Sequence, residues 1–350
     1  MITTIGVIGA NGQVGSEVCL FLATWPGVRV VPICRNTFGS TLLRRAGLEC
    51  RHGTVGSPER ARALLEGCDL IADFSLPGGL ATEFRSASAR TLEHAIQYGP
   101  AGAPFVYAST MMAFGMPIDG RTFRHHLLSR TVYGANKRWA EARARRLGRR
   151  AGRPIYALRI VQVHGELQGV SRMWLQSLPD GPVAISDAAS YTVFAGTIAE
   201  ALVGIAKGLE RPGTYTLVSS PTWTWREVHD YYCDLAGVPR SAPRAATAQA
   251  RGVARAALEQ GRRLAVRYRD VATGYVLPRF PRLEMRAMSW HHRRQAQAEI
   301  AALEAPPARP PVPYGGPIPG ARLRSLSDSR QTLGPRTATV RELMRRIGEV

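Results

Sequence analysis

The sequence of 350 residues predicts an α/β fold, a doubly wound parallel sheet with a smaller, mostly helical C-terminal lobe. Three observations predict it. Short apolar runs alternate with longer segments of helical spacing, a glycine-rich turn follows the first run, and Ala/Arg-rich segments replace this pattern beyond Gly237. Alternating strands and helices favour a parallel sheet, because parallel strands are joined by helical crossovers that cover both faces.

Each element follows from this alternation. The expected strands are short and mostly apolar, like strands buried on both faces, and cover residues 4–8, 28–33, 70–74, 105–108, 155–161 and 213–218. The expected helices cover residues 15–24, 58–65, 81–98, 133–152, 198–209 and 224–236. The last begins at Thr224 with Glu227 three residues on, which indicates a capping box. Further on we expect helices over 245–264, 286–303 and 339–350 and a Pro/Gly-rich loop over 305–320.

Composition limits the possible classes of protein. The formal net charge is +20, and residues 240–350 carry +13 of it, which suits a solvated surface or a diphosphate-bearing substrate. No known nucleic-acid-binding motif accompanies this charge, so we expect no nucleic-acid partner. No apolar stretch approaches the roughly 20 residues of a membrane span, and no basic leader precedes the N-terminal run. The five scattered cysteines lack metal-ligand spacing, so we expect a cytoplasmic protein without metal.

The turn between the first strand and the first helix predicts a dinucleotide site. Three glycines let the backbone turn tightly and approach a pyrophosphate, whose charge then lies on free N–H groups at a helix N-terminus. We therefore expect the turn to bind the cofactor through Gly9, Asn11, Gly12, Gln13, Val14 and Gly15.

Two further motifs predict proton chemistry beside that site. The strand over 105–108 runs into two hydroxyl residues, Ser109 and Thr110. Tyr133 follows, with Lys137 four positions later on the same face of a helix. Only two of the 46 lysines and arginines are lysines. A lysine four positions after this tyrosine is therefore rarely expected by chance.

With its GxxGxxG spacing, Ser/Thr segment and YxxxK motif in this order, the chain resembles the extended short-chain dehydrogenase/reductase family of sugar-nucleotide epimerases, dehydratases and reductases. The resemblance covers about residues 1–238. It implies a Rossmann-type domain that binds NAD(P), over residues 1–165 and 191–218. A substrate lobe would then comprise residues 166–190 and 219–350.

The resemblance also implies a catalytic triad. Thr110, five residues before Gly115, would orient the substrate oxygen, and Tyr133 would exchange a proton with it. The ammonium of Lys137 would favour the phenolate and hold the nicotinamide ribose, so that Tyr133 and Lys137 both also contact the cofactor. The family's fourth active-site residue, an asparagine, is replaced by Arg85 in a rough alignment.

The end of the second strand favours NADP over NAD. Arg35 and Asn36 stand where an acidic residue binds the ribose hydroxyls of NAD, and an arginine suits the 2′-phosphate of NADP. Arg35 could also be one of many surface arginines, and in that case NAD is equally acceptable as the cofactor. By resemblance, Ser75 and Leu76 are further cofactor contacts after the fourth strand, whereas Thr54 replaces an acidic residue that often approaches adenine.

Residues 158–166 are similar to the family's LRxxNVYGP pattern, which opens the substrate site. Gln162 and His164 stand at its Asn and Tyr positions and are therefore candidate substrate contacts, although a structural histidine explains His164 equally well. The other substrate candidates are Ser109, Met111 and Arg172, the last as a cation for a nucleotide diphosphate.

Residue types narrow the reaction. Met111 and Met112 replace the Asp-Glu pair of a 4,6-dehydratase, and the cysteine of a fucose-synthase-like enzyme is also missing. The leading interpretation is an NAD(P)-dependent oxidoreductase or epimerase that acts on a sugar nucleotide. The alternatives are an NADPH-dependent ketoreductase or dehydrogenase of a non-sugar molecule, and a non-catalytic NADP-binding sensor or scaffold. By analogy alone, helices flanking Tyr133 would form a homodimer.

Overall fold

Eight parallel strands form the central sheet of the computed structural model, which describes residues 2–78, 80–114, 131–178, 185, 187, 189–240, 272–303, 322–324 and 334–348. Their spatial order is β10-β9-β6-β5-β4-β1-β2-β3. The strands are β1 (Thr3–Ile8), β2 (Val28–Cys34), β3 (Arg51–His52), β4 (Leu70–Asp73), β5 (Phe105–Thr110), β6 (Ile155–Ile160), β9 (Gly213–Val218) and β10 (Arg322–Arg324). The order reverses between β1 and β4, the kind of switch point at which such sheets bind ligands. The predicted doubly wound fold is confirmed.

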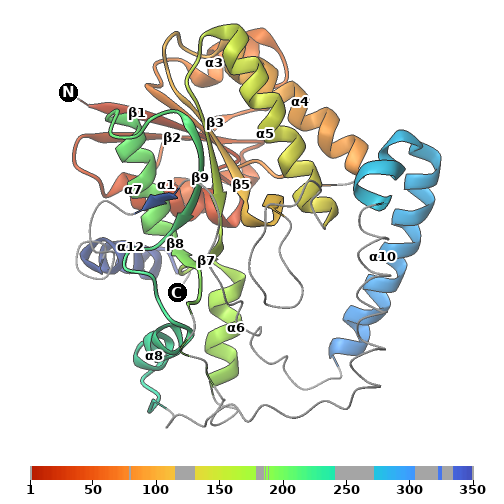
Figure 1. Cartoon of the computed structure of the whole chain (residues 1–350). Helices are drawn as coiled ribbons and strands as arrows, with labels where there is room; N and C mark the ends of the chain where they lie inside the picture. The colour runs from red at the N-terminus through yellow and green to blue at the C-terminus, as the bar shows by residue number, and fades with distance from the viewer. Residues whose placement is uncertain are drawn as a thin grey trace.

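Helices cover both faces of this sheet (Figure 1). One face packs against α3, α4 and α5, through a core that includes Leu64, Leu92 and Leu147. The other packs against α1, α7 and α12, through a core that includes Leu22 and Ile198. The α-helices are α1 (Gln13–Ala23), α2 (Thr41–Arg45), α3 (Pro58–Leu65), α4 (Ala81–Tyr98), α5 (Val132–Ala151), α6 (Gly169–Ser177), α7 (Ala195–Ala206), α8 (Trp225–Ala236), α10 (Pro281–Leu303) and α12 (Gly334–Arg346).

A smaller part of the molecule lies beyond β6. It contains a second parallel pair of strands, β7 (Gln162–His164) and β8 (Thr192–Phe194), with α6 and α8. An aromatic core, including Trp174, Trp225 and Tyr232, holds these helices together. The capping box predicted at the start of α8 is confirmed, since Thr224 and Glu227 each accept the other's backbone N–H.

The C-terminal third departs most from expectation. β10 pairs with β9 in the main sheet and α12 contacts α1, so both lie with the eight-stranded sheet, whereas the sequence places residues 219–350 in the smaller lobe. The helix expected over 245–264 and the loop expected over 305–320 lie outside the described residues, as does Gly115. No helix within the described ranges is long and apolar enough to cross a membrane.

One contact ties α10 to the body of the protein. The carboxylate of Glu284 accepts the backbone N–H of Ala81 at 2.7 Å and the hydroxyl of Thr82 at 2.9 Å. A negative side chain at the first turn of α4 satisfies an amide that the helix leaves unpaired and complements the helix dipole. α10 begins at Pro281, before the expected residue 286, and proline suits the first position of a helix.

Candidate active site

The glycine turn at the end of β1 leaves no room for side chains. Gly9 has a φ of +75°, and a Cβ atom there would lie 2.7 Å from the backbone nitrogen of Ser75. A Cβ atom at Gly15 would lie 2.4 Å from the carbonyl oxygen of Gly9. Gly12 is the N-cap of α1, and no side chain caps the first amides of this helix. Such an N-terminus suits a phosphate group.

A cleft of about 350 Å³ opens at this turn. Its lining comes from the ends of β1, β2, β3 and β4 and from α4, and includes Gly9, Asn11, Gly12, Arg35, Thr54, Ser75, Leu76 and Arg90. Arg35 and Arg90 are its charged members, and no carboxylate belongs to the lining that the structure describes. The local charge is therefore positive, which suits a ligand that carries phosphates. Of the expected cofactor residues in the turn and after β2, Gln13, Val14, Gly15 and Asn36 do not line this cleft.

Tyr133 and Thr110 meet at the carboxyl end of β5. Thr110 ends that strand, and Tyr133 lies in the first turn of α5, whose N-cap Thr131 accepts the N–H of Gly134 at 2.9 Å. The side chains of Tyr133 and Thr110 lie close together, while Tyr133 stays 39% exposed. Burial raises the pKa of Tyr133, and the neighbouring hydroxyl of Thr110 opposes this shift. The pair therefore presents a protonated phenol to an accessible surface at neutral pH.

Lys137 lies one helical turn behind Tyr133 and is buried. Its Nζ donates to the carbonyl oxygen of Ala108 at 2.8 Å and lies 4.8 Å from the centre of the Tyr107 ring. Burial lowers the pKa of Lys137 to about 8, against the attraction of buried carboxylates such as Asp73. Within the described part of the chain Lys137 makes no hydrogen bond to Tyr133, so the expected lowering of the pKa of Tyr133 by this ammonium is not seen.

Buried polar contacts anchor α5 beside the lysine. Arg159 donates two hydrogen bonds, of 2.8 and 2.7 Å, to the carboxylate of Glu141, which also accepts the hydroxyl of Ser109. Arg85, at the position of the family's asparagine, donates Nε to the side-chain oxygen of Asn136 at 3.0 Å. These bonds join α5 to β5, β6 and α4, and so fix the helix that carries Tyr133.

The substrate candidates differ in exposure and lie on different elements. Ser109 and Met111 are buried, Gln162 is half-buried on β7, and Arg172 is exposed on α6. His164 is fully buried, its Nδ1 lies 2.7 Å from the hydroxyl of Tyr232, and burial lowers its pKa to about 3. A structural role, the alternative given for His164, fits this position.

A buried carboxylate connects the cofactor helix to the loop that follows β7. Glu17 on α1 is inaccessible to solvent and accepts the backbone N–H groups of Glu166 at 2.7 Å and Leu167 at 3.1 Å. It also accepts the side-chain N–H of Gln168 at 2.7 Å. Burial raises the pKa of Glu17 to about 7, although these donors oppose the shift. Glu17 therefore titrates close to neutral pH.

We expect this carboxyl to make stability depend on pH. The pKa of Glu17 rises from 4.5 to about 7 on folding, so the folded state binds the extra proton between these values. The stabilisation that this proton gives to the folded state is complete below pH 4.5. It is lost as the pH rises through about 7. Glu17→Gln removes the titrating group, so the difference in free energy of unfolding, wild type minus variant, should fall as pH rises from about 4.5 to about 7.5. Urea unfolding measures it, and a constant difference would contradict the assignment.

Arg90 and Glu17 are functional candidates that the sequence did not single out. Arg90 is one of 44 arginines, and nothing local distinguishes it until α4 is placed beside the cleft. Glu17 did leave a signal, because it is the one acidic residue in the apolar sequence of α1. A buried charge in such a place calls for hydrogen-bonding partners from elsewhere in the chain.

The parallel sheet with helices on both faces and the glycine turn after β1 are those of a Rossmann-type α/β protein. Residues 5–178 match the model of the NAD dependent epimerase/dehydratase family. Over these residues the chain is similar to that family, whose members have the extended short-chain dehydrogenase/reductase fold, and the chain is homologous to NAD-dependent epimerases and dehydratases. A comparison with curated protein sequences found no match.

Solved structures share the fold at low sequence identity. UDP-glucuronic acid 4-epimerase from Bacillus cereus, in complex with NAD, is 16% identical with a TM-score of 0.53, over 69% of this chain and 86% of that one. UDP-N-acetylglucosamine 4-epimerase from Bacillus cereus is 19% identical with a TM-score of 0.54, over 69% and 85%. dTDP-glucose 4,6-dehydratase from Bacillus anthracis, in complex with NAD, is 15% identical with a TM-score of 0.52, over 69% and 84%.

Proposed function

We propose that this chain transfers hydride between NAD(P) and a carbon of a sugar nucleotide, as an oxidoreductase or an epimerase. The observation that carries the proposal is the position of Tyr133 close to Thr110, with the buried Lys137 one helical turn behind it, at the sheet edge that also bears the glycine turn. The family match supports the reaction class. The NAD and nucleotide sugars named for the solved neighbours support the choice of ligands.

The residues at the turn fit a dinucleotide. The space that a Cβ atom would need at Gly9 and Gly15 is taken by backbone, so the loop keeps the form that lets a pyrophosphate approach the amides of α1. Arg35 and Arg90 would then neutralise phosphate at the edge of the cleft. The bound dinucleotide supplies a nicotinamide that accepts or donates hydride.

The side chains of the protein would carry out the proton transfer. Tyr133 can donate its phenolic proton to the oxygen of a substrate carbonyl while the carbon gains hydride. Thr110, which lies close to Tyr133, can hydrogen-bond the same oxygen and fix its direction. Lys137, with its pKa of about 8, stays largely protonated at neutral pH. Its positive charge can offset the negative charge left on Tyr133 after the proton is donated. The raised pKa of Tyr133 suits donation, and hence the reductive direction, better than abstraction.

We further propose that NADP is preferred to NAD, although the solved neighbours named above hold NAD. Two guanidinium groups and no carboxylate, among the described residues, line the cleft where the adenosine end would lie. A carboxylate at that place would instead accept the ribose hydroxyls of NAD and repel a 2′-phosphate. The cytoplasmic location and the homodimer expected from sequence are also part of the proposal.

Arg35→Asp should reverse this preference. We expect the ratio of NADPH to NADH dissociation constants to rise by about tenfold or more, because the variant exchanges an attractive charge for a repulsive one. Cofactor fluorescence titration measures both constants. Arg211→Asp, an equal change of charge at an exposed position outside the cleft, should leave the ratio unchanged. An unmoved ratio in Arg35→Asp would remove this residue from the cofactor site.

A thermal-shift panel separates the candidate functions. NAD, NADP, UDP, GDP and a set of nucleotide sugars are added singly and in pairs to the full chain. Stabilisation by a nucleoside diphosphate or its sugar supports the proposed substrate class. Stabilisation by NADP but not by UDP, GDP or any nucleotide sugar favours the ketoreductase of a non-sugar molecule. The absence of any dinucleotide response would contradict the proposal.

A further inference from the structure

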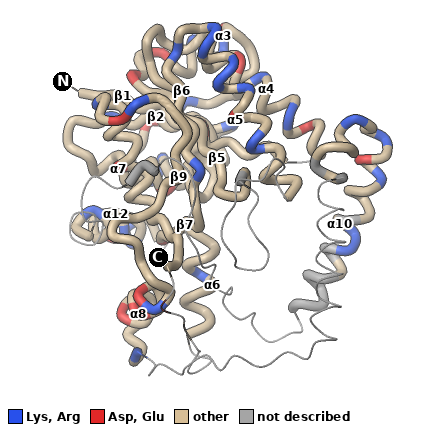
Figure 2. The backbone as a smooth tube through the Cα atoms, viewed as in Figure 1, with Lys and Arg blue, Asp and Glu red and all other residues tan. Residues whose placement is uncertain are grey.

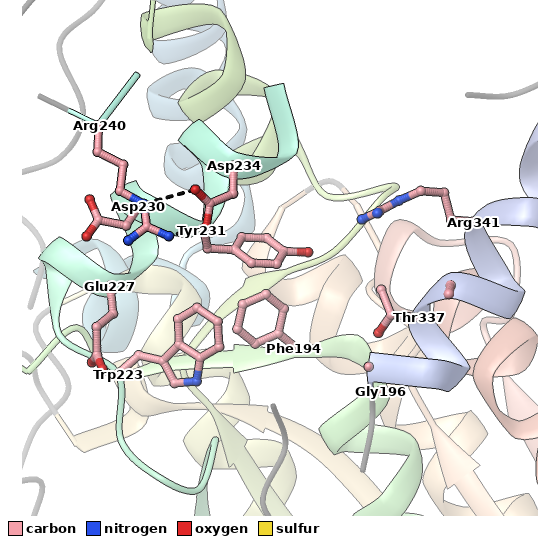
Figure 3. A pocket seen from close by; sticks show the side chains of 12 residues that line it. Phe194, Gly196, Trp223, Glu227, Asp230, Tyr231, Asp234, Arg240, Thr337 and Arg341 are labelled. Carbon is pink, nitrogen blue, oxygen red and sulfur yellow. Dashed lines mark hydrogen bonds and ion pairs between the residues drawn. The ribbon is translucent and has the colours of Figure 1, made fainter. Parts of the chain in front are cut away.

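A second cavity, of about 520 Å³, lies between α8 and α12 and shares no described lining residue with the cofactor cleft. Figure 3 shows it from close by, with Asp230 and Glu227 on one side, Thr337 and Arg341 on the other, and aromatic rings between them. Its volume is within the usual range for small-molecule sites. Neither the proposed reaction nor the family match gives it a role.

The middle of this cavity is a rigid aromatic wall of Phe194, Trp223 and Tyr231. Their ring centres lie 4.9 Å apart for Phe194 and Trp223, 5.5 Å for Phe194 and Tyr231, and 5.6 Å for Trp223 and Tyr231. The two contacts of Tyr231 are edge-to-face, an arrangement that aromatic pairs favour. Because the rings hold one another in place, little side-chain freedom remains to be lost when a flat apolar group lies against them.

One side of the cavity is acidic, in a chain whose net charge is +20. Glu227, Asp230 and Asp234 follow one another at three- and four-residue steps along α8 and therefore share one face of that helix. Figure 2 shows this acidic group on α8. All three residues line the cavity.

The two arginines of the lining are matched by carboxylates. Arg240 is paired with Asp234 at 2.6 Å, at the exposed rim. Arg341 donates to Glu166, which lies outside the lining, through both Nε and a terminal nitrogen. The described lining thus holds three carboxylates and two arginines, one of which is already paired with a carboxylate from outside, so its net charge is negative.

We propose that this cavity is a second, non-catalytic binding site for a small organic cation with a flat apolar body. The body would lie on Tyr231, Trp223 and Phe194, and the ammonium or guanidinium group would face Asp230. Aromatic faces and a nearby carboxylate both attract such a group, while an anion of the same shape would meet repulsion. The proposal does not rest on the proposed function, since no residue of the cofactor cleft or the triad takes part.

The test uses phenethylamine and phenylacetate, which share an aromatic body and differ in the sign of their charge. Saturation-transfer NMR and calorimetry on the full chain should show saturable binding of phenethylamine in the millimolar range or tighter and none of phenylacetate. Asp230→Asn should weaken phenethylamine binding by about fivefold or more, because it removes the carboxylate that the ammonium group would face. Ala338→Phe should abolish binding, since it fills the cavity from an exposed position on α12.

Asp187→Asn is the matched control, because Asp187 is an exposed carboxylate outside the lining. It should leave the dissociation constant within about twofold of wild type. Equal binding of phenylacetate, absence of saturable phenethylamine binding, or binding that survives both Asp230→Asn and Ala338→Phe would each overturn the proposal. Both ligands are compared on the wild-type chain, so this comparison tests the proposal even if one variant folds poorly.

Discussion

Tyr133→Phe is expected to lower turnover by about 10²- to 10⁴-fold and to leave cofactor affinity within about twofold of wild type. Phenylalanine keeps the ring and the start of α5 but has no proton to give to the substrate oxygen. Lys137 keeps its own contacts with Ala108 and Tyr107 in this variant. Turnover is measured by NADPH or NADH absorbance on the nucleotide sugar that the thermal-shift panel selects, and cofactor affinity by fluorescence.

Tyr98→Phe provides the control for this experiment. Tyr98 lies at the far end of α4, where its ring contacts Arg62 at 5.0 Å, and the variant likewise loses only a hydroxyl group. Its turnover should equal that of wild type. Normal turnover in Tyr133→Phe would exclude Tyr133 as the proton donor, and a large loss of cofactor affinity would mean that its hydroxyl serves binding rather than chemistry.

Much of the fold could be predicted because most of its elements are locally encoded. The helices over Pro58–Leu65 and Ala81–Tyr98 begin and end at the predicted residues, and the central strands differ by only one or two. Buried parallel strands are apolar throughout, and amphipathic helices repeat at their own period, so each leaves a pattern in its own residues. The shortest strands, such as β3 and β10, have two or three residues and thus no period to detect.

The contacts that bring distant segments together left no such pattern. Glu284 caps α4 from 203 residues away, and Glu17 meets Glu166 across 149. The sequence shows that Glu17 is an unusual residue for an apolar helix, but not which amides it accepts. Likewise, the order of the motifs predicts that Thr110, Tyr133 and Lys137 act together, whereas the partners of Lys137 depend on the exact position of β5 behind it. The motifs therefore say little about the contacts that surround these residues.

Gly165→Ala should destabilise the protein by about 2–3 kcal/mol, the largest stability effect expected of so small a change. The backbone of Gly165 does not have positive φ, so the effect is steric: a Cβ atom there would lie 2.1 Å from Oε1 of Glu17. The end of a glutamate side chain usually moves aside easily. Here it cannot, because the same carboxylate accepts the N–H groups of Glu166, Leu167 and Gln168. Urea unfolding at constant pH measures the loss.

A double-mutant cycle identifies the cause. In a Glu17→Ala background the obstructing carboxylate is absent, so adding Gly165→Ala should cost less than about 1 kcal/mol. Gly169→Ala serves as the control: a Cβ atom there has no neighbour within 4 Å, so the change should be neutral or slightly stabilising. If Gly165→Ala costs the same in both backgrounds, the clash with Glu17 is not its cause. A penalty confined to the wild-type background would mean that one carboxylate on the cofactor helix sets the path of the chain from β7 into α6.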